Sequence, residues 1–468
     1  MASRFAECTL APPMVQPASI DPRRHRTLWI VVTVSITASI LASYQVSTMS
    51  LVLGSESGRW VYEYLAHFTR HSARVLLQVL AVAALLTAAP LALIRRHQWP
   101  MVLMWLVAGM VLQAELRSQT RYTLQQMFES DGANGYYTAI TKHSADEVVR
   151  NFETIRPTLA VHAKSNMPGK LLFLHALTLI SIDPALLPWL VVAVSNLGGL
   201  LMYLFVRDLT GDRVTGLFAL VLYLFVPAKL YFFPILNTIT PVVVLGFAWL
   251  WLHAVRGGRP VHAAGLGVAF YALVFFEPLP LVTGGMFAVL IWQMVRTGRL
   301  TWLTLGRQAA IAAAAALAVH AAMRMVFDFD LFRAFQLLMA DAVDFNREAQ
   351  RPYGVWLGQN LLDFGFAMGV SQAVLMLGLL AVATWQRWWT DAAVAATAGL
   401  VAVVLVTNAL GVNRGEVVRL WIFLACLLQI PAASICARLD SRAALLLVLT
   451  ATIVQGALGT AMMGFATP

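Results

Sequence analysis

The segment LLPWLVVAVSNLGGLLMYLFV, residues 186–206, is long and apolar enough to indicate the fold class. It carries no charge, and a helix of about 20 residues crosses the roughly 30 Å hydrocarbon core of a membrane. The whole chain is similar in character, because 59% of its 468 residues are hydrophobic and only 12% are charged. A soluble domain carries about 25% charged residues. The sequence therefore predicts an all-α integral membrane protein, since helices satisfy their own backbone groups in lipid.

Comparable apolar runs recur along the chain, and they predict a polytopic bundle of about 11 to 13 spans. One domain covers residues 28–468, after a disordered cytoplasmic tail at residues 1–27. This tail is rich in Pro and Ala and ends in basic residues, without the early apolar run and cleavage site of a signal peptide. The predicted spans lie near residues 28–47, 74–94, 99–115, 186–206, 214–233, 237–255, 262–276, 279–296, 302–323, 361–384, 391–411, 417–436 and 442–464.

The distribution of basic residues predicts the orientation of the bundle. With a cytoplasmic N-terminus every short inner turn carries arginine, as the positive-inside rule requires. The net charge of +10 therefore indicates membrane topology, and we expect no nucleic-acid partner. The longer loops, near residues 48–73, 116–185 and 324–360, then all lie outside. We expect an integral protein of the bacterial inner membrane, with membrane lipid around it and its polar groups on the extracytoplasmic face.

Two outer loops contain segments that are typical of helices at a membrane surface. SADEVVRNFETIR (residues 144–156) has apolar residues at helical spacing and predicts an amphipathic helix. GKLLFLHALTLISI (residues 169–182) is apolar but too short to span, which favours a re-entrant or interfacial helix. The 324–360 loop predicts a further amphipathic outer element. We expect these loops to fold over the outer face of the bundle.

Three stretches resemble the GT-C superfamily of integral membrane glycosyltransferases. Residues 129–170 place Asp131 before YYTAI and end in a Met-Pro-Gly-Lys turn, in the order of the first large outer loop of that superfamily. RDLTGDRVTGLFALVLYLFVP (residues 207–227) is similar to one of its inner turns, and NRGEVVRLWIFL (residues 413–424) to the entry of a late helix. The sequence departs from the superfamily pattern because Asp131 follows the third predicted span and Pro168 stands alone.

The resemblance implies transfer of a sugar from a polyprenyl-phosphate donor to an acceptor hydroxyl on a glycan, lipid or protein, by an enzyme that we expect to be inverting. Asp131 is the candidate general base, because partial burial raises the pKa of a carboxylate toward neutrality. A loop aspartate can equally be solvated or cap a helix, and Asp-Gly is also a turn signal.

Cations beside the leaving phosphate would stabilise the transition state more than the ground state. Arg419 and Arg414 are the first candidates, since arginine binds two phosphate oxygens at once. Glu416 lies one helical turn before Arg419 and could orient it. The alternative is a snorkelling arginine with an exposed ion pair. The other donor-phosphate candidates, which could instead contact lipid headgroups, are His162, Lys164 and Lys170.

Further residues are candidates for substrate contact. Glu277 lies between two apolar runs, where an ionisable group is expected to be paired or functional; a tight exposed turn is the alternative. Tyr353 and Trp356 could stack on a sugar, although both also fit an aromatic belt. The full set of substrate-binding candidates is Glu416, Glu277, Asn166, Tyr136, Tyr137, Tyr353 and Trp356.

The sequence indicates no metal site and no cofactor, although a requirement for a divalent cation stays open. Asp328 and Asp330 form an Asp-x-Asp pair, but they precede a helical pattern whose positive end acidic residues cap. No phosphate loop, HExxH, GxSxG or CxxC pattern is present, so we expect neither ATP nor NAD chemistry. The rival functions are a transporter or lipid flippase, which would show repeated halves and polar groups at mid-depth, and a non-catalytic scaffold.

Overall fold

The computed structural model describes residues 22–89 and 91–468. Within these residues ten helices are long and apolar enough to cross a membrane, and one bent helix pair makes eleven. Two shorter apolar helices, α15 (Pro260–Phe276) and the α23–α24 segment (Ile422–Arg438), lie at two further predicted spans. The predicted all-α polytopic bundle is therefore confirmed. The ten long spans are α1 (Pro22–Ser47), α2 (Arg70–Thr87), α4 (Gln98–Arg117), α11 (Leu187–Thr210), α12 with α13 (Arg213–Phe232), η2 with α14 (Leu236–Gly257), η3 with α16 (Leu279–Arg296), α17 (Trp302–Phe327), α21 (Ala392–Leu410) and α25 (Arg442–Met462).

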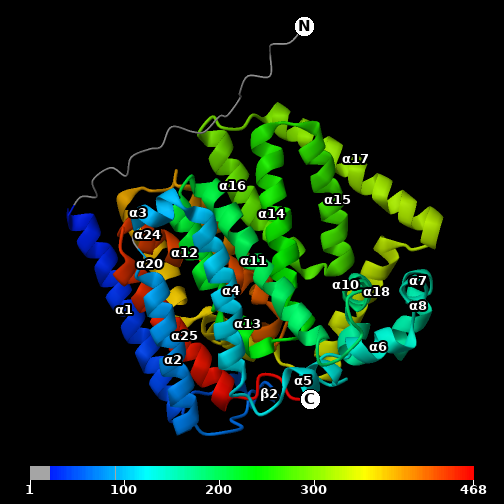
Figure 1. Ribbon diagram of the computed structural model, residues 1–468. Helices are drawn as coiled ribbons and strands as arrows, with labels where there is room; N and C mark the ends of the chain where they lie inside the picture. The colour runs from blue at the N-terminus through cyan, green and yellow to red at the C-terminus, as the bar shows by residue number, and fades with distance from the viewer. Residues whose placement is uncertain (1–21, 90) are drawn as a thin grey trace.

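The spans differ widely in how much of their surface the protein covers. The segment of α12 (Arg213–Leu224) and α13 (Pro227–Phe232) is buried along its whole apolar window. In contrast, none of the corresponding window of α17 is buried, and this helix packs mainly along α15 at the edge of the bundle (Figure 1). An apolar helix that leaves its surface uncovered would face lipid. The core of the protein therefore surrounds α12 and α13.

One predicted span is broken in the structure. Residues 361–384 were expected to form a single helix, but α19 (Tyr353–Met368) and α20 (Val370–Gln386) meet at an angle of 104°. The break falls at Gly369, whose φ of +102° lies outside the range of ordinary L residues. The buried Gln455 accepts a bond from the first amide of α20 at 2.9 Å and donates to a carbonyl of α19 at 2.7 Å. A side chain from a distant helix thus satisfies the backbone groups that the break releases.

Two predictions near the N-terminus need correction. The disordered tail was expected to extend to residue 27, but α1 begins at Pro22, so residues 22–27 are helical. The remainder of that tail, residues 1–21, lies outside the described residues. The predicted span at residues 74–94 is also shorter than expected, because α2 ends at Thr87 and a separate helix, α3 (Leu91–Arg96), follows.

Most of the short elements that connect the spans gather at one end of the bundle, at the lower and right side of Figure 1, whereas α3 lies at the upper left. They come from the three loops that the sequence places outside, near residues 48–73, 116–185 and 324–360, and from the segment before α23. They are β1 (Gly54–Ser55), β2 (Trp60–Val61), α5 (Leu124–Glu129), α6 (Tyr136–Lys142), α7 (Ala145–Arg150), α8 (Phe152–Ile155), η1 (Arg156–Thr158), α9 (Val161–Lys164), α10 (Gly169–Thr178), α18 (Leu331–Glu348) and α22 (Val417–Leu420).

Local sequence explains where several of these helices begin. Thr123 and Ser144 form complete capping boxes at α5 and α7, in which side chain and backbone bond reciprocally. The predicted amphipathic helix of residues 144–156 is present but is divided at Asn151 into α7 and α8. Asp330 caps α18, as its sequence context indicated, by accepting from the amides of Phe332 and Arg333. Capping thus helps to start α5 and α7, which at six residues each are too short to be stable alone.

Candidate functional site

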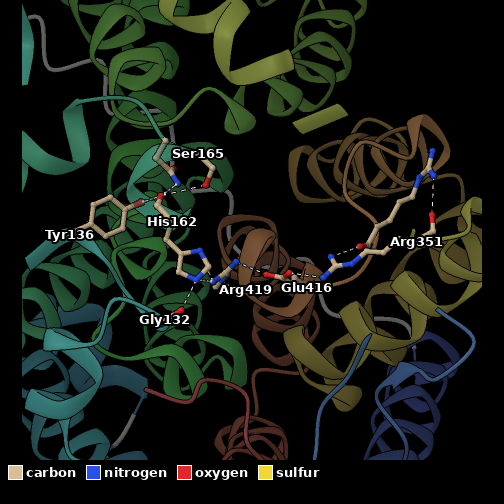
Figure 2. Close-up of polar contacts among 9 residues, drawn as sticks. Gly132, Tyr136, His162, Ser165, Arg351, Glu416 and Arg419 are labelled. Carbon is tan, nitrogen blue, oxygen red and sulfur yellow. Dashed lines mark hydrogen bonds and ion pairs between the residues drawn. The ribbon is translucent and has the colours of Figure 1, made fainter. Parts of the chain in front are cut away.

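An ion-paired chain of side chains lies among the short elements at this end of the bundle and connects segments that are far apart in the sequence (Figure 2). The Glu416 carboxylate lies between two guanidinium groups: Arg351 Nη2 is 2.8 Å from Oε1, and Arg419 Nη2 contacts Oε2. Arg351 also donates to the Arg414 carbonyl at 2.7 Å. All three paired side chains are largely buried, with exposed fractions of 5% to 14%. Burial strengthens these ion pairs but makes the removal of any one member costly.

The backbone at Glu416 adopts a conformation that few residues favour. Its φ of +57° is left-handed, and it follows Gly415, whose φ is +78°. A non-glycine residue in this region costs about 1 kcal/mol or more, so the surrounding contacts must hold it. Burial alone would raise the pKa of Glu416, but Arg419 and Arg351 outweigh it and keep that pKa below the usual 4.5. The carboxylate is therefore ionised at neutral pH.

His162 extends the chain from α22 to the Asp131 loop. Arg419 Nη1 lies 2.9 Å from His162 Nε2 and 3.3 Å from Nδ1, and Nε2 lies 2.9 Å from the Gly132 carbonyl oxygen. Burial, together with the charge of Arg419, lowers the pKa of His162 to about 4, so the ring is neutral at neutral pH. One consistent tautomer donates from Nε2 to Gly132 and accepts from Arg419 at Nδ1. The histidine thus bridges a cation and the turn that contains Asp131.

The backbone carbonyl of His162 is itself held by side chains from two predicted site residues. Tyr136 donates its hydroxyl to this oxygen at 3.0 Å, and Asn166 donates its amide at 2.8 Å. Tyr136 follows Gly135, which has a φ of +69°. A side chain at position 135 would place its Cβ only 2.8 Å from the Cβ of Ala160. Only glycine fits such a turn without displacement. The turn at Gly135 and the Tyr136 hydroxyl therefore hold the Asp131 loop against the segment that contains His162.

A second buried ion pair lies beside this chain. Lys170 Nζ is 2.8 Å from Glu277 Oε2, and the two side chains are 0% and 6% exposed. Thr240 donates its hydroxyl to the same carboxylate oxygen. Gly169 allows the pair to form, because a Cβ there would lie 2.4 Å from the carbonyl oxygen of Phe275 at the end of α15. Glu277 is therefore paired, and the exposed-turn alternative for it is wrong.

The candidate base is placed beside the chain but is not bonded to it. Asp131 is exposed, and its carboxylate has no hydrogen-bond or ion-pair partner among residues 22–89 and 91–468. The partial burial that the sequence led us to expect is thus not present in this structure. The adjacent residue, Gly132, is the one that contacts His162. The loop brings Asp131 to the neighbourhood of Arg419 while leaving its side chain free.

Three other predicted residues brace the loops around Glu416. Arg414 donates to the carbonyl of Arg351 at 3.0 Å, and its guanidinium lies over the Tyr353 ring at 5.5 Å. Tyr353 is 40% exposed and donates its hydroxyl to a backbone carbonyl of α21 at 2.6 Å. Trp356 is only 1% exposed and donates its indole N–H to Gly58 at 3.2 Å. The prediction that Trp356 stacks on a sugar is wrong for this structure, because no face of its ring is open.

The remaining predicted residues lie outside the chain. Lys164 is half-buried, and within the described part of the protein its ammonium group has no partner. Tyr137 packs its ring against Phe128 at a centroid distance of 5.5 Å. Of the Asp-x-Asp pair, Asp328 has a largely exposed side chain, and Asp330 caps α18. No group of three or more possible metal ligands occurs in the described residues.

Sequence reasoning missed two residues of this region. Arg351 stands before a proline in a loop without a motif, and only the structure shows that it pairs with Glu416. Its guanidinium also lies 5.1 Å from the Trp60 ring centroid. Tyr62 is 3% exposed, and burial followed by the charge of Glu416 raises the pKa of its hydroxyl. The 324–360 loop carries several other charged residues, so no sequence signal singled out Arg351.

The charges of the region are unbalanced in a way that suits an anion. Arg351, Arg419 and Lys170 supply three positive charges, whereas Glu416 and Glu277 supply two negative ones. His162 is neutral, so these five groups carry a net charge of +1, and the neighbouring Arg414 and Asp131 add one charge of each sign. A partly buried cationic centre favours a phosphate or carboxylate ligand.

No protein-family model matches the chain, and a search of curated proteins finds no match.

Proposed function

We propose that this integral membrane protein transfers a sugar from a polyprenyl-phosphate donor to an acceptor hydroxyl, as a transferase of the GT-C type. The observation that supports this proposal most strongly is the chain Arg351–Glu416–Arg419–His162–Gly132. It joins three separate outer segments in one cationic centre and ends beside a free carboxylate. A transfer site needs these two components, an anion-binding group and a base, close together.

Arg419 is the proposed ligand of the donor phosphate. Glu416 holds one edge of its guanidinium, and His162 contacts the other nitrogen, so the fork has a fixed orientation. Fixed cations stabilise the charge that develops on a leaving phosphate without having to reorganise. Lys170 was also predicted to bind phosphate, but its side chain is fully buried and paired with Glu277. We assign Lys170 and Glu277 a positioning role, since they hold the start of α10 against α15.

Asp131 is the proposed general base. The acceptor oxygen would attack the anomeric carbon while its proton passes to the Asp131 carboxylate. The bond between that carbon and the phosphate oxygen would break, and the phosphate would leave with the electron pair. Asp131 suits this role because its carboxylate is free and lies next to the Gly132–His162 contact. A base must reach the proton directly or through one water.

A lipid-borne donor fits the surroundings of the site. Spans such as α17 leave their apolar surface uncovered, and α18 exposes large apolar side chains, including Phe332 and Val343. The polyprenyl tail would lie along such surfaces in the bilayer while its phosphate reaches the cationic centre. We propose that this centre faces the extracytoplasmic side of a bacterial inner membrane. The acceptor would be a glycan, a lipid or a protein.

The proposal is tested by supplying purified protein with radiolabelled polyprenyl-phosphate sugars and a panel of acceptors. The wild-type protein is expected to form labelled product. Asp131→Asn should lower kcat by about 100-fold or more, the usual contribution of a general base. Arg419→Gln should lower kcat as well, whereas Asp146→Asn, an exposed carboxylate of the same loop paired on the surface with Arg150, should not. Equal turnover by wild type and Asp131→Asn contradicts the assigned role.

A transporter or lipid flippase is the second candidate, and the break between α19 and α20 favours it. Discontinuous helices are common at the substrate sites of transporters. Here the Gln455 side chain bonds to the backbone on both sides of the break. Flux of labelled donor across proteoliposomes without formation of product would support this candidate over the transferase.

A further inference from the structure

A cationic pocket separate from the Arg351–Arg419 chain lies between the ends of α4, α13 and α25. It has a volume of about 30 Å³, and at roughly 10–15 Å³ for each water it has room for about two. None of the residues of the Arg351–Arg419 chain lines it. Its lining residues are Leu65, Ala66, Arg117, Thr120, Arg121, Tyr122, Met127, Tyr231, Thr460, Ala461, Met462, Met463, Phe465 and Ala466.

The walls of this pocket are held in place by backbone and ring contacts. The amide of Leu65 donates to the Met462 carbonyl at 2.8 Å. The amide of Gly464 donates to the Glu63 carbonyl, also at 2.8 Å. These bonds pair the β2–α2 loop with the chain after α25. The Tyr231 ring stacks on Phe465 at a centroid distance of 4.0 Å. With the segment from Arg117 to Met127, the pocket is therefore formed by four segments of the chain.

Arg117, the last residue of α4, is the central group of the pocket. It is 9% exposed, and its Nη1 reaches the carbonyl oxygens of Leu230 and Tyr231 only at 3.4 and 3.5 Å. Its Nε has no acceptor, and no carboxylate pairs with it among residues 22–89 and 91–468. A buried guanidinium without a counter-charge is costly, and such a group calls for an anion.

A second buried polar group of the pocket is also without a partner. Thr460 is 5% exposed, and its hydroxyl has no partner in the part of the chain that the structure describes. A threonine in a helix usually bonds to a preceding carbonyl, as Thr452 does to Val448 at 2.7 Å. The hydroxyl of Thr460 instead lies enclosed, without a partner, in the wall of the pocket that Arg117 also lines. Two unpartnered groups, a cation and a hydroxyl, thus line the same small cavity.

The composition of the lining indicates the charge of the ligand. Arg121, which is exposed, adds a second positive charge to that of Arg117, and no lining residue is acidic. Two positive charges complement a phosphate better than a carboxylate. A volume with room for about two waters admits about two of the oxygens of such a group and excludes a sugar ring. Leu65, Met127 and Met462 make the surroundings apolar, which is compatible with a carbon chain attached to the phosphate.

We propose that the Arg117–Thr460 pocket binds a phosphate group, either free in solution or as the headgroup of a lipid. Arg117 would donate to one phosphate oxygen from its Nη2, which has no partner among residues 22–89 and 91–468, and Thr460, whose hydroxyl is enclosed in the wall, would turn its side chain to donate to another. Arg121 would add charge at the mouth of the pocket. This site does not depend on the proposed sugar transfer, because it uses none of the residues assigned to that reaction.

The test measures binding of radiolabelled inorganic phosphate to the full chain in a phosphate-free detergent, at constant ionic strength, and each protein is compared with and without Arg419→Gln, which removes the other proposed phosphate ligand. The wild-type protein should bind saturably, and Arg117→Gln should bind roughly ten- to hundredfold more weakly, as expected for the loss of a charge-assisted hydrogen bond. Thr460→Val should weaken binding about fivefold to tenfold, because only a neutral hydroxyl is lost. Arg70→Gln, which removes an exposed arginine at the start of α2, should bind as the wild type does.

A second arm distinguishes the two sources of phosphate. The same protein is placed in nanodiscs of phosphatidylcholine with or without phosphatidic acid, and binding of inorganic phosphate is measured again. Competition by phosphatidic acid that is lost in Arg117→Gln assigns the pocket to lipid headgroups, and absence of competition assigns it to free phosphate. The absence of phosphate binding by the wild type overturns the proposal. Undiminished phosphate binding by Arg117→Gln also overturns the proposal. If Arg117→Gln does not purify as a folded protein, undiminished binding by Thr460→Val overturns it instead.

Discussion

Replacing Glu416 with glutamine removes the negative charge that holds Arg351 and Arg419 together. The three side chains are 12%, 5% and 14% exposed, so solvent can replace little of the lost attraction. Breaking a buried ion pair by removing one partner costs about 3 to 5 kcal/mol. Glutamine keeps one acceptor oxygen, which favours the lower end of that range. We therefore expect Glu416→Gln to lower the free energy of unfolding by about 3 kcal/mol.

The pH dependence of stability gives this prediction a second readout. The pKa of Glu416 in the folded protein lies below its ordinary value of 4.5. Its stabilising contribution is therefore fully present above pH 4.5 and is lost as the pH falls through the lower, folded-state pKa. Wild-type protein in detergent should lose stability below pH 4.5, as measured by intrinsic tryptophan fluorescence during denaturation. Glu416→Gln should lack that component.

Glu63→Gln provides the matched control, because Glu63 is an exposed carboxylate of the neighbouring outer loop. An exposed substitution of this kind should change stability by no more than about 0.5 kcal/mol. The reasoning is refuted if Glu416→Gln is as stable as this control, or if both variants lose stability with the same pH profile as the wild type. Either result would mean that the two arginines do not depend on the Glu416 charge.

The other predictions concern the neighbouring contacts. Lys170→Met should destabilise the protein by about 3 to 5 kcal/mol, and adding Glu277→Leu should recover much of that loss in the same denaturation assay, since no unpaired charge is left; a double variant less stable than the single one would contradict this. The pKa of His162 falls from 6.5 to about 4 on folding, so the unfolded chain binds the proton more readily and stability should decline as pH drops from 6.5 to 4. His162→Gln should remove that slope, and an unchanged slope would show that another group causes it. Asp330→Ala should cost about 1 kcal/mol through the lost cap of α18, seen as faster proteolysis within that helix but not elsewhere.

The spans could be predicted from the sequence because hydropathy and length decide them. Each long apolar helix of the structure overlaps a predicted run, and the short helices α7 and α10 lie where apolar spacing and length indicated. The break at Gly369 could not be predicted. It depends on hydrogen bonds between the backbone and the Gln455 side chain, which accepts from Val370 and donates to Phe366; Gln455 is remote in sequence and identifiable as the partner only after folding.

Only part of the candidate site could be predicted, because contacts between distant segments cannot be identified from the sequence. Arg419 and Glu416 are one helical turn apart, so local spacing was enough to pair them. Arg351 and Arg117 escaped notice because their partners are carbonyls and a carboxylate from distant segments. The exposure of Asp131 depends on how the whole 116–185 loop packs. Local sequence indicates the type of residue at a site, whereas its burial and partners depend on tertiary contacts.

The most direct test of the proposed function uses sealed proteoliposomes in which the protein has one known orientation. Radiolabelled polyprenyl-phosphate sugar and acceptor are supplied on one side at a time, to wild type and Asp131→Asn. Our account predicts labelled product only when the outer-loop side is supplied, and a loss of about 100-fold or more in Asp131→Asn. Product formation that is equal in the two proteins, or labelled donor that crosses the membrane without any transfer, would contradict it.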